Sequence, residues 1–178
     1  MSKLLYEAKV GERTIFNLFQ RDNGYFVVER PSPNIVSLIS ITDEGNLILV
    51  KQYREGINNF CVELPSGLDD KDKPLEQTAL EELEEETGYT SRNIHLAMTL
   101  PKSPGMTNET QWIFWADSPK KVSAGGGVKD EGEDIEVIEV PIKNLYENLL
   151  ALLKEVPIAN SVFSAAFLIQ NRNGGQGC

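Results

Sequence analysis

The chain has 178 residues, 40% of them hydrophobic, which is enough for one domain with a substantial buried core. Its 17 basic and 27 acidic residues give a formal net charge of −10, which argues against broad electrostatic binding of nucleic acid or an anionic membrane. The two cysteines, Cys61 and Cys178, suggest neither a disulfide framework nor a zinc site. No apolar run approaches the roughly 18 residues of a membrane span and no signal pattern is visible, so we expect a cytoplasmic protein.

Strand patterns dominate the first third of the chain. Alternating apolar residues separated by turn residues predict strands at residues 4–10, 13–20, 25–30, 35–42, 46–53 and 60–64. The fourth and fifth of these strands are joined by Asp43-Glu44-Gly45, which predicts that they pair with each other as a hairpin.

The most informative segment is an acidic helix that follows these strands. Pro74 suits the first turn of a helix, and Gly88 suits the position just past its end. Five acidic residues stand near that end, namely Glu81, Glu82, Glu84, Glu85 and Glu86. Because Glu82, Glu85 and Glu86 are three and four apart, we expect them to share one helix face and to repel by roughly 0.2–0.5 kcal/mol per pair. A divalent cation such as magnesium, which binds carboxylate oxygens, would turn that repulsion into attraction.

The second half of the chain mixes strands with helices. Strands are predicted at residues 94–100, 111–116 and 135–141, and helices at residues 142–155 and 158–171. Residues 118–132 are polar and contain Gly125-Gly126-Gly127, which predicts a mobile loop able to move over a site. A tail at residues 173–178 is predicted to be disordered. Strands with interspersed helices favour an α/β fold in which helices sandwich a mixed sheet.

Residues 67–89 carry a spacing that resembles the box of the Nudix hydrolases: Gly, five residues, Glu, seven residues, then Arg-Glu-aliphatic-any-Glu-Glu-any-Gly-aliphatic. The matching positions are Gly67, Glu82, Leu83, Glu85, Glu86, Gly88 and Tyr89. The resemblance covers about residues 35–171 and includes Gln52-Tyr53-Arg54, Glu63-Leu64-Pro65-Ser66-Gly67, Ser103-Pro104-Gly105 and residues 131–136. It is greatest to the ADP-ribose pyrophosphatase branch, which has a Glu-Leu-Pro-Ala-Gly-like segment at the start of the box and a proline after it, matched by Pro104.

The resemblance implies a Nudix-type α/β/α sandwich with a mixed sheet over residues 34–172. Residues 1–33 would form an N-terminal antiparallel sheet extension that mediates a homodimer. The implied reaction is metal-dependent hydrolysis of the pyrophosphate bond of a nucleoside diphosphate sugar, with ADP-ribose giving AMP and ribose 5-phosphate as the first candidate. The implied cofactor is Mg²⁺ or Mn²⁺, and neither nucleic acid nor membrane is an expected partner. Two alternatives stay open, namely another sugar nucleotide such as GDP-mannose, and a nucleotide-binding Nudix homologue with impaired catalysis.

The resemblance also assigns roles to individual residues. The implied metal ligands are Glu82, Glu85, Glu86, Glu133 and the main-chain carbonyl of Ser66. The implied catalytic residues are Glu82, Glu85, Glu131 and Glu133. Of these, Glu131 or Glu133 would bind a further metal or take a proton from the attacking water. The implied substrate contacts are Arg54, whose guanidinium can hold a phosphate through two hydrogen bonds, Pro104 and Gly105.

Two positions in the box depart from the family pattern. Lys73 stands where the family has Glu, and Glu81 stands where it has the Arg before the first metal ligand. In the family these two side chains form an ion pair that braces the loop against the helix, so we predict the same brace with the charges exchanged. Glu81 also adds negative charge near the implied ligands, which would raise the pKa of neighbouring carboxyl groups and is the main support for impaired catalysis.

Overall fold

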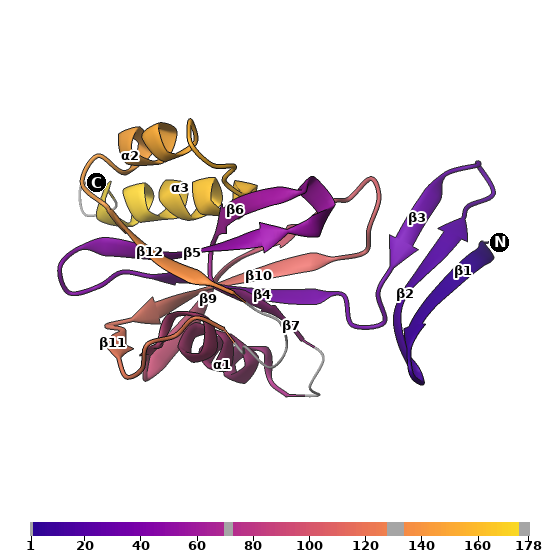
Figure 1. Ribbon diagram of the computed structural model, residues 1–178, viewed down its shortest axis with the longest axis horizontal. Helices are drawn as coiled ribbons and strands as arrows, with labels where there is room; N and C mark the ends of the chain where they lie inside the picture. Colours follow the sequence, from indigo (N-terminus) through magenta and orange to yellow (C-terminus); the bar gives the residue numbers. More distant parts are fainter. Residues whose placement is uncertain (1, 70–72, 128–133, 175–178) are drawn as a thin grey trace.

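The computed structural model describes residues 2–69, 73–127 and 134–174 (Figure 1). Its helices are α1 (Leu75–Thr87), α2 (Leu145–Leu152) and α3 (Asn160–Gly174), with a short 3-10 helix η1 (Glu55–Ile57). Its strands are β1 (Lys3–Val10), β2 (Arg13–Gln20), β3 (Phe26–Glu29), β4 (Asn34–Ser40), β5 (Asn46–Arg54), β6 (Asn59–Glu63), β7 (Ser66–Leu68), β8 (Tyr89–Thr90), β9 (Asn93–Pro101), β10 (Thr110–Asp117), β11 (Lys120–Lys121) and β12 (Glu136–Pro141).

Two sheets form the middle layers of the molecule (Figure 1). One has the strand order β7-β4-β10-β9, in which β4 and β10 are parallel and the other neighbours are antiparallel. The other has the order β12-β5-β6 and is antiparallel throughout. Helix α1 covers one side of these sheets, and helices α2 and α3 cover the opposite side. The predicted α/β/α sandwich with a mixed sheet is therefore confirmed.

The predicted hairpin of residues 35–42 and 46–53 is wrong in its pairing. In the part of the chain that the structure describes, β4 and β5 pair only at their turn, through the bridge between Ile41 and Leu47 and a hydrogen bond from Thr42 N to Asn46 O at 2.9 Å. Beyond it the strands enter different sheets, β4 beside β10 and β5 between β12 and β6. Both strands are largely buried, and each pairs on both edges with strands from later in the chain. The turn residues between β4 and β5 carry no information about these distant partners.

Successive side chains of these central strands point to opposite faces of the sheets, so the core is divided into two clusters. On one side, Val36, Leu38 and Ile48 pack with Ala79 and Leu83 of α1, and all five side chains are fully buried. The opposite faces of the strands join a larger cluster that includes residues of α2 and α3. Because α1 buries one apolar stripe in this way, the rest of its surface presents the acidic run.

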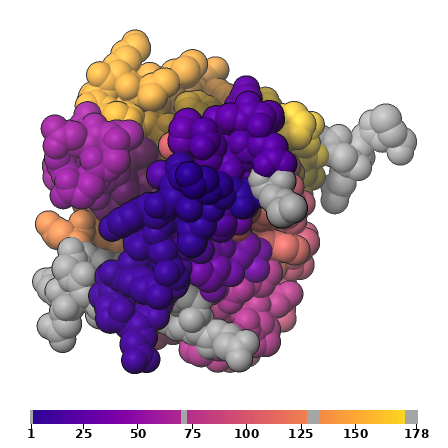
Figure 2. All heavy atoms as spheres, turned by 90° about the vertical axis from the view of Figure 1, so that its right-hand side faces the viewer, coloured from indigo at the N-terminus to yellow at the C-terminus, as the bar shows by residue number. Residues whose placement is uncertain are grey.

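The N-terminal strands form a separate antiparallel sheet in the order β1-β2-β3, as predicted. This sheet stands apart from the sandwich in Figure 1 and crosses the face seen in Figure 2. It meets the sandwich at the loop between β9 and β10, where Val28 N donates a hydrogen bond to Met106 O at 2.8 Å. Several large apolar side chains of the sheet and its turn are half or more exposed, namely Leu4, Tyr6, Val10, Tyr25 and Phe26.

The C-terminal part of the chain differs from prediction mainly at element boundaries. The predicted helices at residues 142–155 and 158–171 are present as α2 and α3, but each begins two or three residues later. Helix α3 runs through Gly174, and residues 175–178 of the predicted tail lie outside the described residues. Across the described ranges, no helix has the length and apolar character needed to cross a membrane.

Candidate active site

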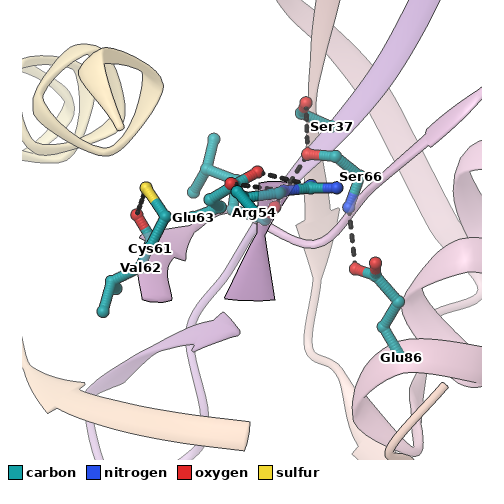
Figure 3. A network of polar contacts seen from close by, with 8 residues as sticks. Ser37, Arg54, Cys61, Val62, Glu63, Ser66 and Glu86 are labelled. Carbon is teal, nitrogen blue, oxygen red and sulfur yellow. Dashed lines mark hydrogen bonds and ion pairs between the residues drawn. The ribbon is translucent and has the colours of Figure 1, made fainter. Parts of the chain in front are cut away.

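The acidic helix faces residues 64–67, where the chain leaves β6, bends at Pro65 and enters β7; we call this bend and the first two residues of β7 the Ser66–Gly67 turn. Pairing of Ser66 with Ser37 of β4 ties this turn to the mixed sheet. The main-chain N–H of Ser66 donates a hydrogen bond to Oε2 of Glu86 at 2.8 Å (Figure 3). The Glu86 side chain is 3% exposed, and a buried carboxylate requires such partners because its removal from water is costly. The turn therefore fixes one of the predicted metal ligands.

Glu82 lies against the same turn, at Gly67. A Cβ atom added to Gly67 would lie 2.0 Å from Cδ and 2.2 Å from Oε1 of Glu82, well inside contact distance. A side chain at Gly67 would therefore displace the Glu82 carboxylate from the turn, although Gly67 does not have a positive φ. Since Glu82 and Glu86 are one helical turn apart, the Ser66–Gly67 turn receives both carboxylates side by side.

Glu85 lies away from this pair. Its side chain is exposed and lines a different cleft of about 800 Å³, together with Lys73, Glu81 and Glu84. Of the three predicted ligands on this helix, Glu82 and Glu86 lie against the turn, whereas Glu85 lines the other cleft. Within the described ranges, no three acidic, histidine or cysteine side chains come together as a ready metal cage.

Lys73 and Glu81 form the predicted brace with exchanged charges. The Lys73 Nζ lies 2.7 Å from both carboxylate oxygens of Glu81, and Gln77 Nε2 donates to Oε1 of the same carboxylate at 3.1 Å. The two charged side chains are 33% and 29% exposed, so solvent screens part of their attraction. The extra negative charge of Glu81 is thus offset locally rather than left to act on the neighbouring carboxylates.

This brace predicts a measurable coupling between the two positions. Lys73→Glu and Glu81→Arg should each lower the free energy of unfolding, because each places like charges together, whereas the double change should restore the pair. For a pair about one-third exposed, we expect a coupling energy of about 0.5–1 kcal/mol in urea unfolding. Strictly additive losses in the double variant would show that the two side chains do not act together.

A cleft of about 410 Å³ opens beside the Ser66–Gly67 turn and carries basic side chains. Arg54 lines it and is held by Glu63 through two hydrogen bonds, both 2.8 Å long (Figure 3). The hydrogen bonds to Glu63 raise the pKa of Arg54 above its ordinary value, while burial opposes the rise. The charge of Glu86 adds to the rise. The guanidinium is therefore firmly charged and oriented where it can meet an anionic ligand.

The loop between β9 and β10 reaches this cleft through its ends. Lys102 and Glu109 line the cleft, together with Arg30, whose Nε lies 2.7 Å from Oε1 of Glu109. Pro104 and Gly105, the predicted substrate contacts, lie in an exposed turn and are not among the residues that line the cleft. Sequence reasoning missed Lys102 and Arg30. The position of Lys102 just before the Ser-Pro-Gly motif was a usable signal, whereas nothing local marked Arg30.

The glycine run after β11 packs against the C-terminal end of α1. Gly126 N donates to Glu86 O at 2.8 Å, and Gly127 N donates to Glu85 O at 3.0 Å. Carbonyl groups in the last turn of a helix lack partners within the helix, and the loop supplies them here. Gly125 has φ +70°, and a Cβ there would lie 2.3 Å from a main-chain carbon of the helix end. These glycines support the end of the helix that carries Glu86.

This packing corrects the prediction for residues 118–132. Lys120–Lys121 pair with Tyr89–Thr90 as strands β11 and β8, and the glycine run is hydrogen-bonded to α1, so the mobile loop is wrong for residues 118–127. The predicted site residues Glu131 and Glu133 lie outside the described residues.

Substitution of Gly125 tests the close approach of the loop to the helix. Gly125→Ala should lower the free energy of unfolding by more than about 2 kcal/mol, because backbone strain adds to a clash with main-chain atoms. Gly11 is a matched control, since it has φ +60° but nothing within 4 Å of an added Cβ. Gly11→Ala should therefore cost only the strain of about 1–2 kcal/mol. Equal losses for the two variants in urea unfolding would contradict the packing.

Comparison with known protein families matches residues 31–162, well over half of the chain, to the NUDIX domain. The chain belongs to the Nudix family. This Nudix protein is 35% identical over 136 residues to an ADP-ribose pyrophosphatase of Bacillus subtilis (strain 168), covering 76% of the chain and 72% of that protein. It is also 35% identical over 118 residues to a GDP-mannose pyrophosphatase of Salmonella arizonae, covering 62% of the chain and 60% of that protein.

A solved structure described as an ADP compounds hydrolase shares the fold of this Nudix protein. The TM-score is 0.64 at 22% sequence identity, with 99% of this chain and 96% of the other covered. Together with the family match, these similarities confirm a Nudix hydrolase of the ADP-ribose pyrophosphatase-like branch.

Proposed function

We propose that this Nudix hydrolase cleaves the pyrophosphate bond of a nucleoside diphosphate sugar, with ADP-ribose giving AMP and ribose 5-phosphate as the first candidate. The observation that carries the proposal is the meeting of Glu82 and Glu86 with the Ser66–Gly67 turn, beside a cleft lined by Arg54. The similarity to an ADP-ribose pyrophosphatase over 76% of the chain supports this choice of substrate.

The donor groups at the turn fit a hard divalent cation such as Mg²⁺ or Mn²⁺. Mg²⁺ typically keeps several waters and takes one or two carboxylates plus substrate phosphates, so a cage of three acidic side chains is not required. The absence of a side chain at Gly67 lets the Glu82 carboxylate lie directly against the main chain of the turn. We propose that Glu82, Glu86 and the Ser66 carbonyl hold the ion, with Glu133 as a further donor, and that Glu85, which lines the other cleft, is not part of this set. A bound ion of this kind offsets charge on phosphate oxygens and lowers the pKa of a bound water.

The remaining residues would bind and orient the substrate. Arg54, fixed by Glu63, and Lys102, which also lines the cleft, would offset the negative charge of a diphosphate. Glu131 or Glu133 would take the proton of the attacking water. Since the charge of Glu81 is offset by Lys73, the main support for a catalytically impaired homologue is weakened.

We further propose that the N-terminal sheet mediates a homodimer. Its exposed apolar side chains are ones that a second copy of the chain would cover. Phe26→Lys should shift the mass measured by analytical ultracentrifugation from two chains toward one. Phe167→Lys is a matched control, because Phe167 has the same 56% exposure as Phe26 but lies on α3. A monomeric wild type, or equal effects of both variants, would contradict the assignment.

A substrate panel tests the proposed reaction. The values of kcat/KM for ADP-ribose, GDP-mannose and other nucleotide sugars should be measured with Mg²⁺ or Mn²⁺, and again after metal removal by EDTA. We expect metal-dependent hydrolysis with ADP-ribose preferred. Preference for GDP-mannose would favour the second candidate, which the 35% identity to a GDP-mannose pyrophosphatase supports. Hydrolysis that persists without metal would contradict the proposed site.

A further inference from the structure

A chain of buried hydrogen bonds runs from the interior of the mixed sheet to the Ser66–Gly67 turn. Gln111 of β10 is 3% exposed, and its Nε2 donates to Oγ of Ser37 at 2.8 Å. Ser37 of β4 is fully buried, and its Oγ lies 2.7 Å from Oγ of Ser66 (Figure 3). The Ser66 hydroxyl then donates to Leu64 O at 2.7 Å.

The direction of every hydrogen bond in this chain follows from the groups at its ends. Leu64 O only accepts, so the single hydroxyl proton of Ser66 is used there, and Ser66 must accept from Ser37. Ser37 therefore gives its own proton to Ser66 and accepts from the Gln111 amide. Both hydroxyls donate once and accept once, which leaves one satisfied arrangement and hence one satisfied position for the turn.

The turn held in this way is the one that contacts both acidic side chains. The N–H of Ser66 binds Oε2 of Glu86 at 2.8 Å, and the next residue, Gly67, lies directly beneath Glu82. A shift of the turn by a few tenths of an ångström would therefore move a carboxylate partner and the Ser66 carbonyl together. The Ser66 hydroxyl bonds to Ser37 and Leu64, and the Ser66 N–H bonds to Glu86. Ser66 therefore links the buried chain of hydrogen bonds to the acidic helix.

We propose that Ser37 and Gln111 are positioning residues, which set the Ser66–Gly67 turn so that Glu82 and Glu86 bind a divalent cation. This inference rests on the proposed metal-dependent function. Neither residue touches the cation or the substrate, and both act through Ser66. Their effect should therefore appear in metal affinity beyond any effect on folding.

The strand that carries Ser37 offers a matched control. Ser40 is also on β4 and fully buried, and its hydroxyl has no hydrogen-bond partner among the residues that the structure describes. Ser37→Ala and Ser40→Ala make the same chemical change at the same burial on one strand. Mn²⁺ binding should be measured for both by electron paramagnetic resonance of the free ion, at a temperature where both variants are folded.

We expect Ser37→Ala to weaken Mn²⁺ binding roughly tenfold and Ser40→Ala to leave it within twofold of wild type. Ser66→Ala, a second variant that keeps the backbone N–H, should weaken binding to a similar extent. The Ser37→Ala/Ser66→Ala double variant should lose little more, because both changes break one chain. If Ser37→Ala fails to fold, Ser66→Ala and Gln111→Leu decide the question.

Mn²⁺ binding by Ser37→Ala and Ser66→Ala as tight as that of Ser40→Ala would overturn the inference. A wild type that binds Mn²⁺ but hydrolyses no nucleotide sugar would contradict the proposed function alone, and the comparison of variants would still decide the positioning role. A wild type that binds no Mn²⁺ would overturn both.

Discussion

Glu86→Gln is expected to lower turnover of the preferred nucleotide sugar by more than about a hundredfold, since loss of a mere outer-shell partner of a metal already costs about 10–100-fold. The amide oxygen of glutamine can still accept the hydrogen bond from Ser66 N, so the turn should keep its place. Removal of a nearly buried charge from an acidic helix should leave the melting temperature unchanged or raise it. The variant therefore separates catalysis from stability.

Glu84→Gln is the matched control for this change. Glu84 lies on the same helix, but its side chain is exposed and lines the cleft on the side away from the turn. We expect its turnover to stay within about threefold of wild type, as for surface changes far from a site. Equal losses in the two variants would mean that general charge on the helix, rather than the carboxylate at Ser66, governs activity.

Gly67→Ala is expected to abolish most activity while leaving the fold nearly as stable as wild type. The added Cβ would meet the end of the Glu82 side chain, which can swing away, and Gly67 does not need a positive φ. The cost to unfolding free energy should therefore stay below about 1 kcal/mol. Displacement of Glu82 from the turn should lower turnover by about tenfold to a hundredfold and raise the Mg²⁺ concentration needed for half-maximal activity.

Gly56 provides the comparison for Gly67. Neither glycine has a positive φ, but an added Cβ at Gly56 would meet nothing within 4 Å. Gly56→Ala should keep both activity and melting temperature. A Gly67→Ala variant with wild-type turnover would place Glu82 outside the catalytic site.

Much of the site was predictable because the box encodes it at short range. The resemblance to the Nudix box implied that Glu82, Glu86 and the Ser66 carbonyl act together, and the structure brings these residues close to one another. The exchanged signs at Lys73 and Glu81 were also readable, since two opposite charges swapped together keep the same attraction. Helix geometry alone did not predict that Glu85 points to a separate cleft, because which side of α1 is covered depends on the turn and on the glycine run.

The errors in the predicted fold come from long-range pairing. The turn between β4 and β5 suggested a hairpin, but β10 and β12, far along the chain, take their pairing edges. The glycine run suggested mobility, whereas Gly125 needs its lack of a side chain to lie against the end of α1. The chain from Gln111 through Ser37 to Ser66 joins three strands, and no local pattern marks such a contact.

The most direct test of the account is the rate of AMP formation from ADP-ribose by wild-type protein as the Mg²⁺ or Mn²⁺ concentration is raised from zero. We expect no turnover without metal, saturable turnover with it, and loss of that turnover in Glu86→Gln but not in Glu84→Gln. Absence of turnover at every metal concentration, with ADP-ribose still raising the melting temperature, would contradict catalysis and indicate a nucleotide-binding protein on the Nudix fold.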